Sequence, residues 1–257
     1  MTAQEWPADD YAIGSYIQAT VAEKYLSYLN INPTDHVLDI GCGNGAFTKK
    51  ILDKVPHGSV LGIDASENML RLAKEVIKSY PNFSIKKADV LSLQFNAQFD
   101  YIVSFWCLQW TTDIHKAFEN IFDALKPGGK ILTVFPAGDD PYIMAYYAIK
   151  KSGLFHSLID FTPPMDYSKL DNLSDKLKNI PFNTLKVERC KRFMMLPSLD
   201  VFRKFVNGIV FYQGQVPEYE LKLINEAVVH YFEEECRRKY QGKYQFDFTL
   251  YLVTGTK

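Results

Sequence analysis

The sequence of 257 residues lacks several features that would assign it to a common class of protein. No apolar run approaches the length of a membrane-spanning segment, and the N-terminus carries acidic residues in place of the apolar stretch of a signal peptide. The four cysteines have no C-x-x-C spacing, which predicts free thiols in a reducing compartment. We therefore expect a soluble, cytoplasmic protein with no membrane partner.

Neither the charge nor the histidines mark a nucleic-acid or metal site. The formal net charge is −1, so no broad basic face is expected, and the five histidines are scattered with no two at metal-ligand spacing. The chain has no internal repeat, and its apolar content of 47% is enough for the core of one domain with additions. We expect no metal, no nucleic-acid partner, and a monomer or homodimer.

The sequence does contain a short apolar stretch that is followed by three glycines at alternate positions. Residues 37–40 have the composition of a buried strand, and Gly41, Gly43 and Gly45 lead into a plausible helix at 46–52. Glycines allow positive φ and let a ligand approach the backbone. A purely structural turn would need one glycine, so three favour a nucleotide-binding unit.

The acidic residue of this strand bears on the kind of nucleotide. The spacing of Gly41, Gly43 and Ala46 also fits the dinucleotide fingerprint, which is a weak pattern by itself. Asp39 would face the diphosphate of a dinucleotide with the wrong sign, but its carboxylate suits a cationic ligand that carries an amino group. We therefore favour a cationic nucleoside ligand over a dinucleotide.

Two further acids follow the next two predicted strands. Asp64 lies 19 residues beyond Gly45, where a carboxylate can accept hydrogen bonds from both hydroxyls of a ribose. Asp89 ends the third strand in the same way. Each acid alone could be a turn or capping residue, but one acid at the end of each of three successive strands predicts a shared site.

Strand and helix patterns alternate through the first half of the chain. Apolar runs predict strands at 37–40, 59–63, 83–88, 99–104 and 130–135, with helices at 19–29, 46–52 and 113–125 and another that begins after Ser66 as its N-cap. Strands separated by helices predict an α/β fold with a doubly wound, mostly parallel sheet, whose ligand lies at the carboxyl ends of the strands.

The second half is less regular and predicts an inserted helical cap. Prolines and aromatic residues are interspersed through 137–185, after which the pattern gives a strand at 187–196, helices at 199–210 and 217–240, and a final strand at 246–255. We divide the chain into an N-terminal lid segment at 1–30, a ligand-binding core at 31–136, the cap at 137–185, and a C-terminal part of the core at 186–257 with helices between its two strands.

The stretch Asp39-Ile40-Gly41-Cys42-Gly43-Asn44-Gly45 resembles the first motif of class I S-adenosylmethionine-dependent methyltransferases. The resemblance runs over about residues 35–135 and includes the turn Lys126-Pro127-Gly128-Gly129 before the fifth strand. It implies S-adenosylmethionine as cofactor, S-adenosylhomocysteine as product, and a seven-stranded sheet whose last two strands form an antiparallel hairpin.

The same resemblance implies which residues bind the cofactor. Asp39 and the glycines would lie by the methionine part, Asp64 would hold the ribose hydroxyls, and Asp89 would bind the adenine amino group. The complete implied set is Asp39, Gly41, Cys42, Gly43, Asp64, Ala65, Met69, Asp89, Val90 and Ser104.

A narrower resemblance concerns the acceptor of the methyl group. The segment 106–110 looks like the motif after strand four of trans-aconitate and insect juvenile hormone acid methyltransferases, and the spacing of Tyr11, Ser15 and Gln18 is similar to their N-terminal segment. In the hormone acid enzymes, residues that match Gln18 and Trp110 are associated with the carboxylate substrate. The pair Gln109-Trp110 also occurs in malonyl-carrier methyltransferases. These likenesses imply a small carboxylic acid as substrate.

Methyl transfer to a carboxylate requires no general base from the protein. A carboxylate is already ionised at pH 7 and needs no base, so we expect Gln18 and Trp110 to act as catalytic donors that orient it. Tyr11, Trp106, Tyr142 and Tyr146 are candidate walls of the substrate site, although core packing explains each equally well. Methylation of an amine, carbon or phenol stays open, as do an NAD-dependent oxidoreductase and a non-catalytic S-adenosylmethionine-binding protein.

Overall fold

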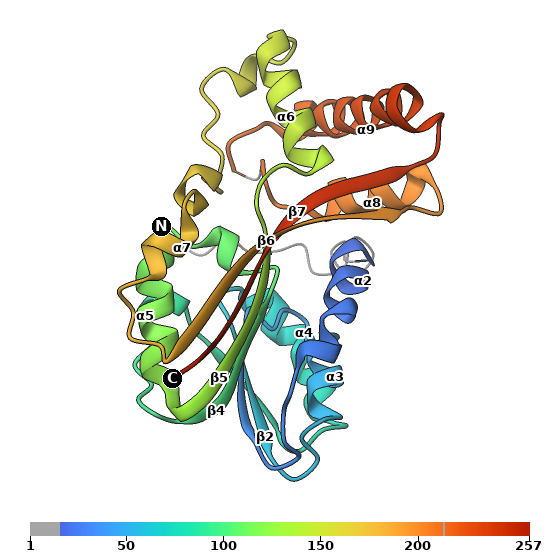
Figure 1. Cartoon of the computed structure of the whole chain (residues 1–257). Coiled ribbons are helices and arrows are strands. Elements are labelled where there is room, and N and C mark those ends of the chain that lie inside the picture. The colour runs from blue at the N-terminus through green and yellow to red at the C-terminus, as the bar shows by residue number, and fades with distance from the viewer. Residues whose placement is uncertain (1–15, 213) are drawn as a thin grey trace.

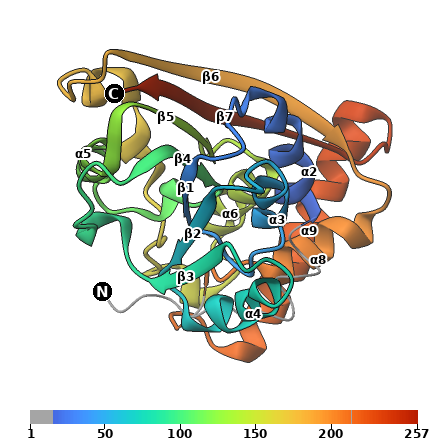
Figure 2. The same cartoon turned by 90° about the horizontal axis from the view of Figure 1, so that it is seen from below.

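The computed structural model describes residues 16–212 and 214–257. Within these residues, seven strands form one sheet, which is seen from two sides in Figures 1 and 2. The strands are β1 (His36–Ile40), β2 (Ser59–Asp64), β3 (Phe83–Lys87), β4 (Phe99–Phe105), β5 (Leu125–Pro136), β6 (Thr184–Met195) and β7 (Gln245–Thr256).

The strand order is β3-β2-β1-β4-β5-β7-β6. Strands β1 to β5 are parallel, and β7 lies antiparallel between β5 and β6. This confirms the predicted doubly wound sheet with an antiparallel hairpin at one side. The chain runs outward from β1 to β3 and then returns to β4 on the other side of β1. Connections therefore diverge at the carboxyl ends of β1 and β4, which is where ligands bind in open α/β sheets.

The helices and turns between these strands mostly lie where the sequence pattern places them. The described ones are α2 (Tyr16–Lys24), η1 (Leu26–Tyr28), α3 (Thr48–Leu52), α4 (Glu67–Ile77), η2 (Val90–Ser92), η3 (Leu108–Trp110), α5 (Ile114–Ala124), α6 (Pro141–Ser152), η4 (His156–Leu158), η5 (Tyr167–Leu170), α7 (Leu173–Leu177), α8 (Leu199–Gly208) and α9 (Glu218–Tyr240). The Ser66 side chain caps α4 by accepting a hydrogen bond from the Met69 N–H, as predicted. The helix predicted at 19–29 already includes Tyr16 and ends earlier, at Lys24, because the chain tightens into the 3₁₀ turn η1 near the end of the predicted range.

Side chains alternate across the sheet and build an apolar core on each face. Val37, Val60 and Val103 pack on the side of α2, α3 and α4, while Leu38 and Ile102 pack on the side of α5 and α7. Figure 2 shows α5 on the opposite side of the sheet from α3 and α4. Parallel strands that are buried on both faces in this way read as continuous apolar runs, which is the pattern of β1 and β4.

A second group of helices lies beyond the carboxyl ends of the parallel strands. Helices α6, α8 and α9 gather above the sheet in Figure 1, and we call them the helical lobe. Its interior is aromatic: the ring centroids of Tyr146 and Phe211 are 5.0 Å apart, and those of Tyr142 and Phe211 are 5.5 Å apart. The lobe thus joins the helix that follows β5 to the two helices between β6 and β7.

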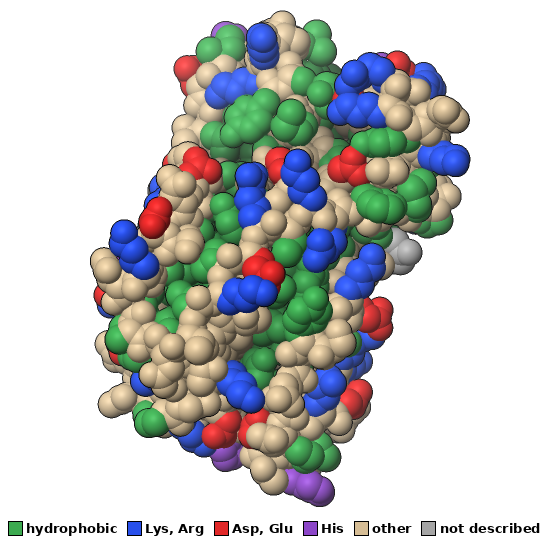
Figure 3. All heavy atoms as spheres, in the orientation of Figure 1, with side chains coloured by type: hydrophobic (Ala, Val, Ile, Leu, Met, Phe, Trp, Pro, Cys, Tyr) green, Lys and Arg blue, Asp and Glu red, His purple; other side chains and the backbone are tan. Residues whose placement is uncertain are grey.

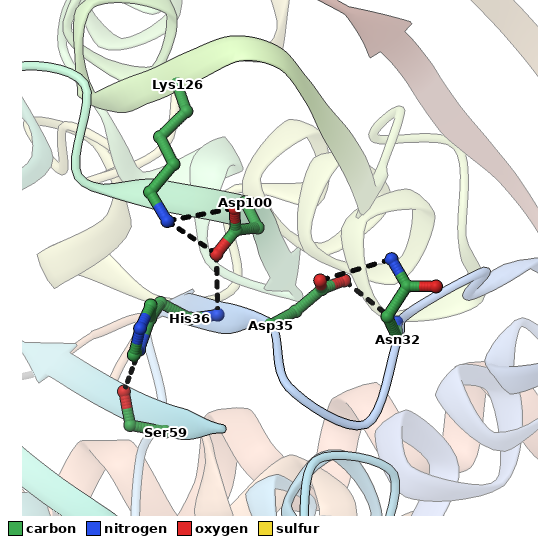
Figure 4. Close-up of polar contacts among 6 residues, drawn as sticks. All are labelled: Asn32, Asp35, His36, Ser59, Asp100 and Lys126. Carbon is green, nitrogen blue, oxygen red and sulfur yellow. Dashed lines mark hydrogen bonds and ion pairs between the residues drawn. The ribbon is translucent and has the colours of Figure 1, made fainter. Parts of the chain in front are cut away.

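Polar contacts tie the strands together at the opposite, amino end of the sheet (Figure 4). The Asp100 carboxylate accepts hydrogen bonds from the His36 N–H at 2.9 Å and from the Lys126 ammonium at 2.8 Å. The His36 ring and the Ser59 hydroxyl are hydrogen-bonded at 2.7 Å. These contacts link the beginnings of β1, β2, β4 and β5. The loops at the carboxyl ends of the strands take no part in these contacts.

The outer strand β6 is a sheet edge that carries charge. Lys186, Glu188, Arg189, Lys191 and Arg192 follow one another along it, and Figure 3 shows Lys and Arg side chains spread with acidic ones over this side of the molecule. Charges on an edge strand oppose pairing with a second sheet. Within the described part of the chain, no helix combines the length and the apolar character that crossing a membrane requires.

Candidate active site

A cavity of about 330 Å³ opens at the carboxyl ends of the parallel strands, below the helical lobe. Its wall has two parts. The glycine-turn end is formed by residues at or beyond the carboxyl ends of β1, β2 and β3: Gly41, Gly43, Asp64, Ala65, Met69, Asp89 and Val90. The lobe end is formed by α2, by the segment after β4, and by the lobe with the loop before it: Gln18, Trp106, Gln109, Trp110, Asp140, Tyr142 and Phe205.

The glycine turn brings backbone directly to the cavity wall. Gly41 has φ of +75°, and a Cβ at this position would lie 2.3 Å from the Cβ of Cys107, so no side chain fits. Gly43 has φ of +56°, lines the cavity, and has no atom within 4 Å of where its Cβ would be. The first glycine therefore permits close packing of the turn on the segment after β4, and the second leaves room for a ligand.

The carboxylate of Asp64 is held in place by two backbone donors. Its oxygens accept hydrogen bonds from the Gly43 N–H at 2.9 Å and from the Ser66 N–H at 2.8 Å. Asp64 also lines the cavity wall, and a carboxylate is a group that accepts hydrogen bonds from a ligand. Asp89 also lines the cavity and accepts from the Leu91 N–H at 2.9 Å. The structure thus brings both predicted strand-end acids to one site.

Asp39, by contrast, lies beneath the glycine turn and not on the cavity wall. Its side chain is buried, with 4% exposed, and accepts a hydrogen bond of 2.7 Å from the Thr48 hydroxyl. Burial raises the pKa of Asp39 to about 7, and the neighbouring Asp64 adds to this effect, while the bond from Thr48 opposes it. Asp39 is therefore not among the residues that line the cavity, and its role beside the methionine part of the cofactor stays a prediction.

Three other predicted residues are also away from the cavity wall. Cys42 is buried against Gly62, where an added Cβ would lie 2.8 Å from the Cys42 sulfur. Ser104 is buried and donates its hydroxyl to the Ile40 carbonyl at 2.9 Å, which joins β4 to β1. Tyr146 packs inside the aromatic interior of the helical lobe. Tyr11 lies outside the described residues.

The residue that organises the lobe end is Trp106. Its φ of +57° is rare for a bulky residue, and such backbone strain persists only where surrounding contacts hold it. Its backbone N–H donates to the Val134 carbonyl at 2.8 Å, and its backbone carbonyl accepts from the side-chain amide of Gln109 at 2.9 Å. Its indole N–H donates to the backbone carbonyl of Gln18 at 3.1 Å. Trp106 therefore ties α2 and the segment after β4 to the end of β5.

Both glutamines of the lobe end leave an amide oxygen unpaired. The Oε1 atoms of Gln18 and Gln109 are buried and have no hydrogen-bond partner among the described residues. The orientation of Gln109 is fixed, because its amide nitrogen donates to Trp106. The Gln18 amide has no such bond and can rotate to present either its oxygen or its N–H to a ligand. Trp110 lines the same end and carries an indole N–H.

Asp140 is a cavity residue that our sequence interpretation missed. It precedes α6 and caps it: one carboxylate oxygen accepts from the N–H groups of Tyr142 at 3.0 Å and Ile143 at 3.2 Å. Burial raises the pKa of Asp140 to about 6, in spite of these two bonds. The signal was present in the sequence, since Asp140 follows the fifth strand as Asp64 and Asp89 follow the second and third.

Helix α8 of the lobe and the segment at η5 contribute further wall residues that no motif indicated. Phe205 of α8 packs edge-on against Tyr142, with ring centroids 6.1 Å apart, and both line the cavity. Tyr167 of η5 and Met165, which precedes η5, line it as well. Of the described residues that line the cavity, none is lysine, arginine or histidine.

Comparisons with known proteins agree with this geometry. A family model described as a methyltransferase domain matches residues 37–129. A malonyl-[acyl-carrier protein] O-methyltransferase of Ilyobacter polytropus is 30% identical over 247 residues, which are 95% of this chain and 90% of the relative. The juvenile hormone acid O-methyltransferase of Bombyx mori is 27% identical over 186 residues, 68% of this chain and 66% of the relative.

A solved structure supports the same fold. Phosphoethanolamine N-methyltransferase 2 of Haemonchus contortus, in complex with phosphomonomethylethanolamine and S-adenosylhomocysteine, has a TM-score of 0.57 and 20% identity to this chain. The similarity covers 94% of this chain and 52% of that one.

Proposed function

Because this chain belongs to the class I S-adenosylmethionine-dependent methyltransferases, we propose that it methylates a carboxylate oxygen of a small organic acid. S-Adenosylmethionine is the cofactor, and it supplies an activated methyl group on a positively charged sulfur. What this chain adds is the placement of the acid. The residues of the lobe end support the proposal, as the next paragraphs explain.

The glycine-turn end fits the cofactor. We propose that the backbone at Gly41 and Gly43 receives the methionine part, that Asp64 accepts from the ribose hydroxyls, and that Asp89 accepts from the adenine amino group. The carboxylates of Asp64 and Asp89 suit these donors, and the open space above Gly43 suits a ligand in contact with the backbone. Ala65, Met69 and Val90 line the same end and provide the apolar surface against which an adenine ring packs.

The observation that carries the acceptor proposal is the meeting of Gln18 and Trp110 at the lobe end. These residues come from α2 and η3, and each can donate a hydrogen bond without adding a charge. They are suited to orient a carboxylate toward the cofactor, and well-oriented reactants can lower a barrier by roughly 7–11 kcal/mol. A carboxylate acceptor also needs no proton removed, so the reaction needs no histidine or lysine base.

The charges of the cavity favour an acid only when the cofactor is bound. With no lysine, arginine or histidine among its described wall residues, the positive charge that attracts the acid is the sulfonium itself. Attraction across a cavity shielded from water is stronger than in bulk solvent. The relatives point in the same direction, since one is named for juvenile hormone acid and another for a malonyl carrier protein.

The test is transfer of a labelled methyl group to a panel of carboxylic acids. We expect the product to release methanol in mild alkali, because a methyl ester is hydrolysed there while methylated amines, carbons and phenols are not. The variants Gln18→Ala and Trp110→Phe should each lower kcat/KM about 10- to 100-fold, the value of a hydrogen bond to a charged group, and should leave S-adenosylhomocysteine affinity unchanged.

A matched control is Gln94→Ala, which alters an exposed glutamine away from the cavity and should not affect the rate. An alkali-stable product would refute carboxylate methylation and leave amine, carbon or phenol methylation. Binding of S-adenosylhomocysteine without turnover of any acceptor would point to a non-catalytic binding protein.

A further inference from the structure

The lobe end of the cavity contains hydrogen-bond acceptors that a carboxylate group, which has no donor, cannot satisfy. Asp140 is nine-tenths buried, and only one of its two carboxylate oxygens has a partner among the described residues. The Oε1 atoms of Gln18 and Gln109 are also buried and unpaired. Gln109 cannot turn its oxygen away without losing its bond to the Trp106 carbonyl. These acceptors would each gain from a donor on a ligand.

Among the residues that the structure describes, no positive group acts on the Asp140 carboxyl. The groups around it are Asp139 on the same loop, Tyr142 on α6 and Tyr167 on η5, and none of them is a cation. Asp139 is engaged elsewhere, since it accepts from the Thr249 N–H at 2.8 Å. A second carboxylate on a bound acid would therefore meet a negative charge at this end of the cavity, whereas a hydroxyl or ammonium group would meet an acceptor.

Helix capping alone does not account for this placement. A cap needs one oxygen, and Asp140 uses one for the N–H groups of Tyr142 and Ile143. Asparagine and serine cap a helix about as well as aspartate and bring no buried charge. The same capping role is filled away from the cavity by Asp113, whose carboxylate accepts from the Lys116 N–H at 2.9 Å at the start of α5.

We propose that Asp140 determines substrate specificity: its second carboxylate oxygen receives a hydroxyl or ammonium group on the body of the substrate and repels a second carboxylate. The proposal rests on the proposed carboxylate methylation, and it narrows the substrate class to monocarboxylic acids that carry a hydrogen-bond donor. Among the described wall residues of the lobe end, Asp140 is the only one with an ionisable carboxyl group, so this selection depends on a single side chain.

The experiment compares matched acids with Asp140→Asn, which keeps the cap and removes the charge. For each chain length from about four to about twelve carbons, kcat/KM is measured with an ω-hydroxy acid and with the corresponding dicarboxylic acid. We expect the intact protein to prefer the hydroxy acid, and Asp140→Asn to reduce that preference at least about tenfold. The control Asp113→Asn should leave the preference within about twofold. An unchanged preference in Asp140→Asn, or a preference of the intact protein for dicarboxylic acids, would overturn the proposal.

Failure of carboxylate methylation is distinguishable from failure of this inference. If no acid is turned over, the same variants are assayed with ω-amino alcohols. Loss of amine methylation in Asp140→Asn but not in Asp113→Asn would keep Asp140 as the receiver of a donor group, and equal activity would overturn it. If neither the acids nor the amino alcohols react, calorimetry measures the binding of decanedioic acid to the protein in complex with S-adenosylhomocysteine. The inference then requires that Asp140→Asn binds this diacid at least about tenfold more tightly than the intact protein does.

Discussion

The buried carboxyl of Asp39 makes a prediction about stability in the absence of ligand. Burial raises its pKa from 3.8 to about 7, and each unit of such a shift corresponds to about 1.36 kcal/mol. A raised carboxyl pKa means that the folded state binds the proton more tightly than the unfolded state. The contribution to stability is therefore fully present below about pH 4 and is lost as the pH rises through about 7, by about 4 kcal/mol in total.

The variant Asp39→Asn removes this titration and keeps an acceptor for the Thr48 hydroxyl. Urea unfolding of both proteins at pH 5 and pH 8 isolates the effect, because contributions from other groups cancel in the difference between the two proteins. We expect the stability of the intact protein to fall relative to Asp39→Asn by about 3 kcal/mol between these pH values. The exposed Asp123 offers a control, since Asp123→Asn should change nothing.

Parallel loss of stability in the intact protein and in Asp39→Asn would refute this reasoning, because Asp39 would then be ionised in the folded state without penalty. A second arm tests the interpretation of Asp39 as the partner of a cationic ligand. A positive charge nearby favours the ionised carboxyl, so saturating S-adenosylmethionine should reduce the pH dependence attributed to Asp39. An unchanged dependence would mean that the charge of Asp39 does not reach the bound cofactor.

Two further predictions concern the glycine turn and Trp106. Gly41→Ala should lower the free energy of unfolding by roughly 3 kcal/mol or more, because its methyl group would overlap the Cys107 Cβ. Gly43→Ala should lower it by only about 1 kcal/mol and should mainly weaken S-adenosylhomocysteine binding. Comparable free energies of unfolding for the two variants would contradict this prediction. Trp106→Phe keeps an aromatic ring but removes the donor to the backbone carbonyl of Gln18. We expect kcat to fall about tenfold while cofactor affinity is unchanged. Equal losses of kcat and cofactor affinity would show that the role of Trp106 is only structural.

The sheet and one half of the site were predictable from sequence because their signals are local. The apolar runs of β1 and β4 and the glycines that follow β1 predict a ligand site at the strand ends. Asp64 and Asp89 were identifiable because the carboxyl ends of parallel strands meet at one edge, whatever the loops between them do. The positions of these residues depend on the sheet alone, and the sheet follows from the alternation of strands and helices.

The lobe end was harder to predict because it depends on packing between distant segments. Helix α6 lies against α9, and nothing local in either helix indicates this partner. Tyr142 and Tyr146 sit one turn apart on α6, yet the first lines the cavity and the second fills the lobe interior. Asp39 shows the complementary problem: the motif indicates an acid near the ligand but does not reveal that Thr48 and burial keep it beneath the turn.

The strained backbone of Trp106 explains why the positions of several groups at the lobe end depend on one residue. A left-handed conformation at a bulky residue costs of order 1–3 kcal/mol, so it must be maintained by contacts that a relaxed conformation would lose. Here those contacts reach three segments: the end of β5 through the backbone N–H, Gln109 through the carbonyl, and Gln18 through the indole. Relaxation of the Trp106 backbone would therefore release the Gln109 amide and the α2 backbone at Gln18 at once. The orientation of the Gln109 amide and the position of α2 at Gln18 thus depend on one residue, which directly follows β4.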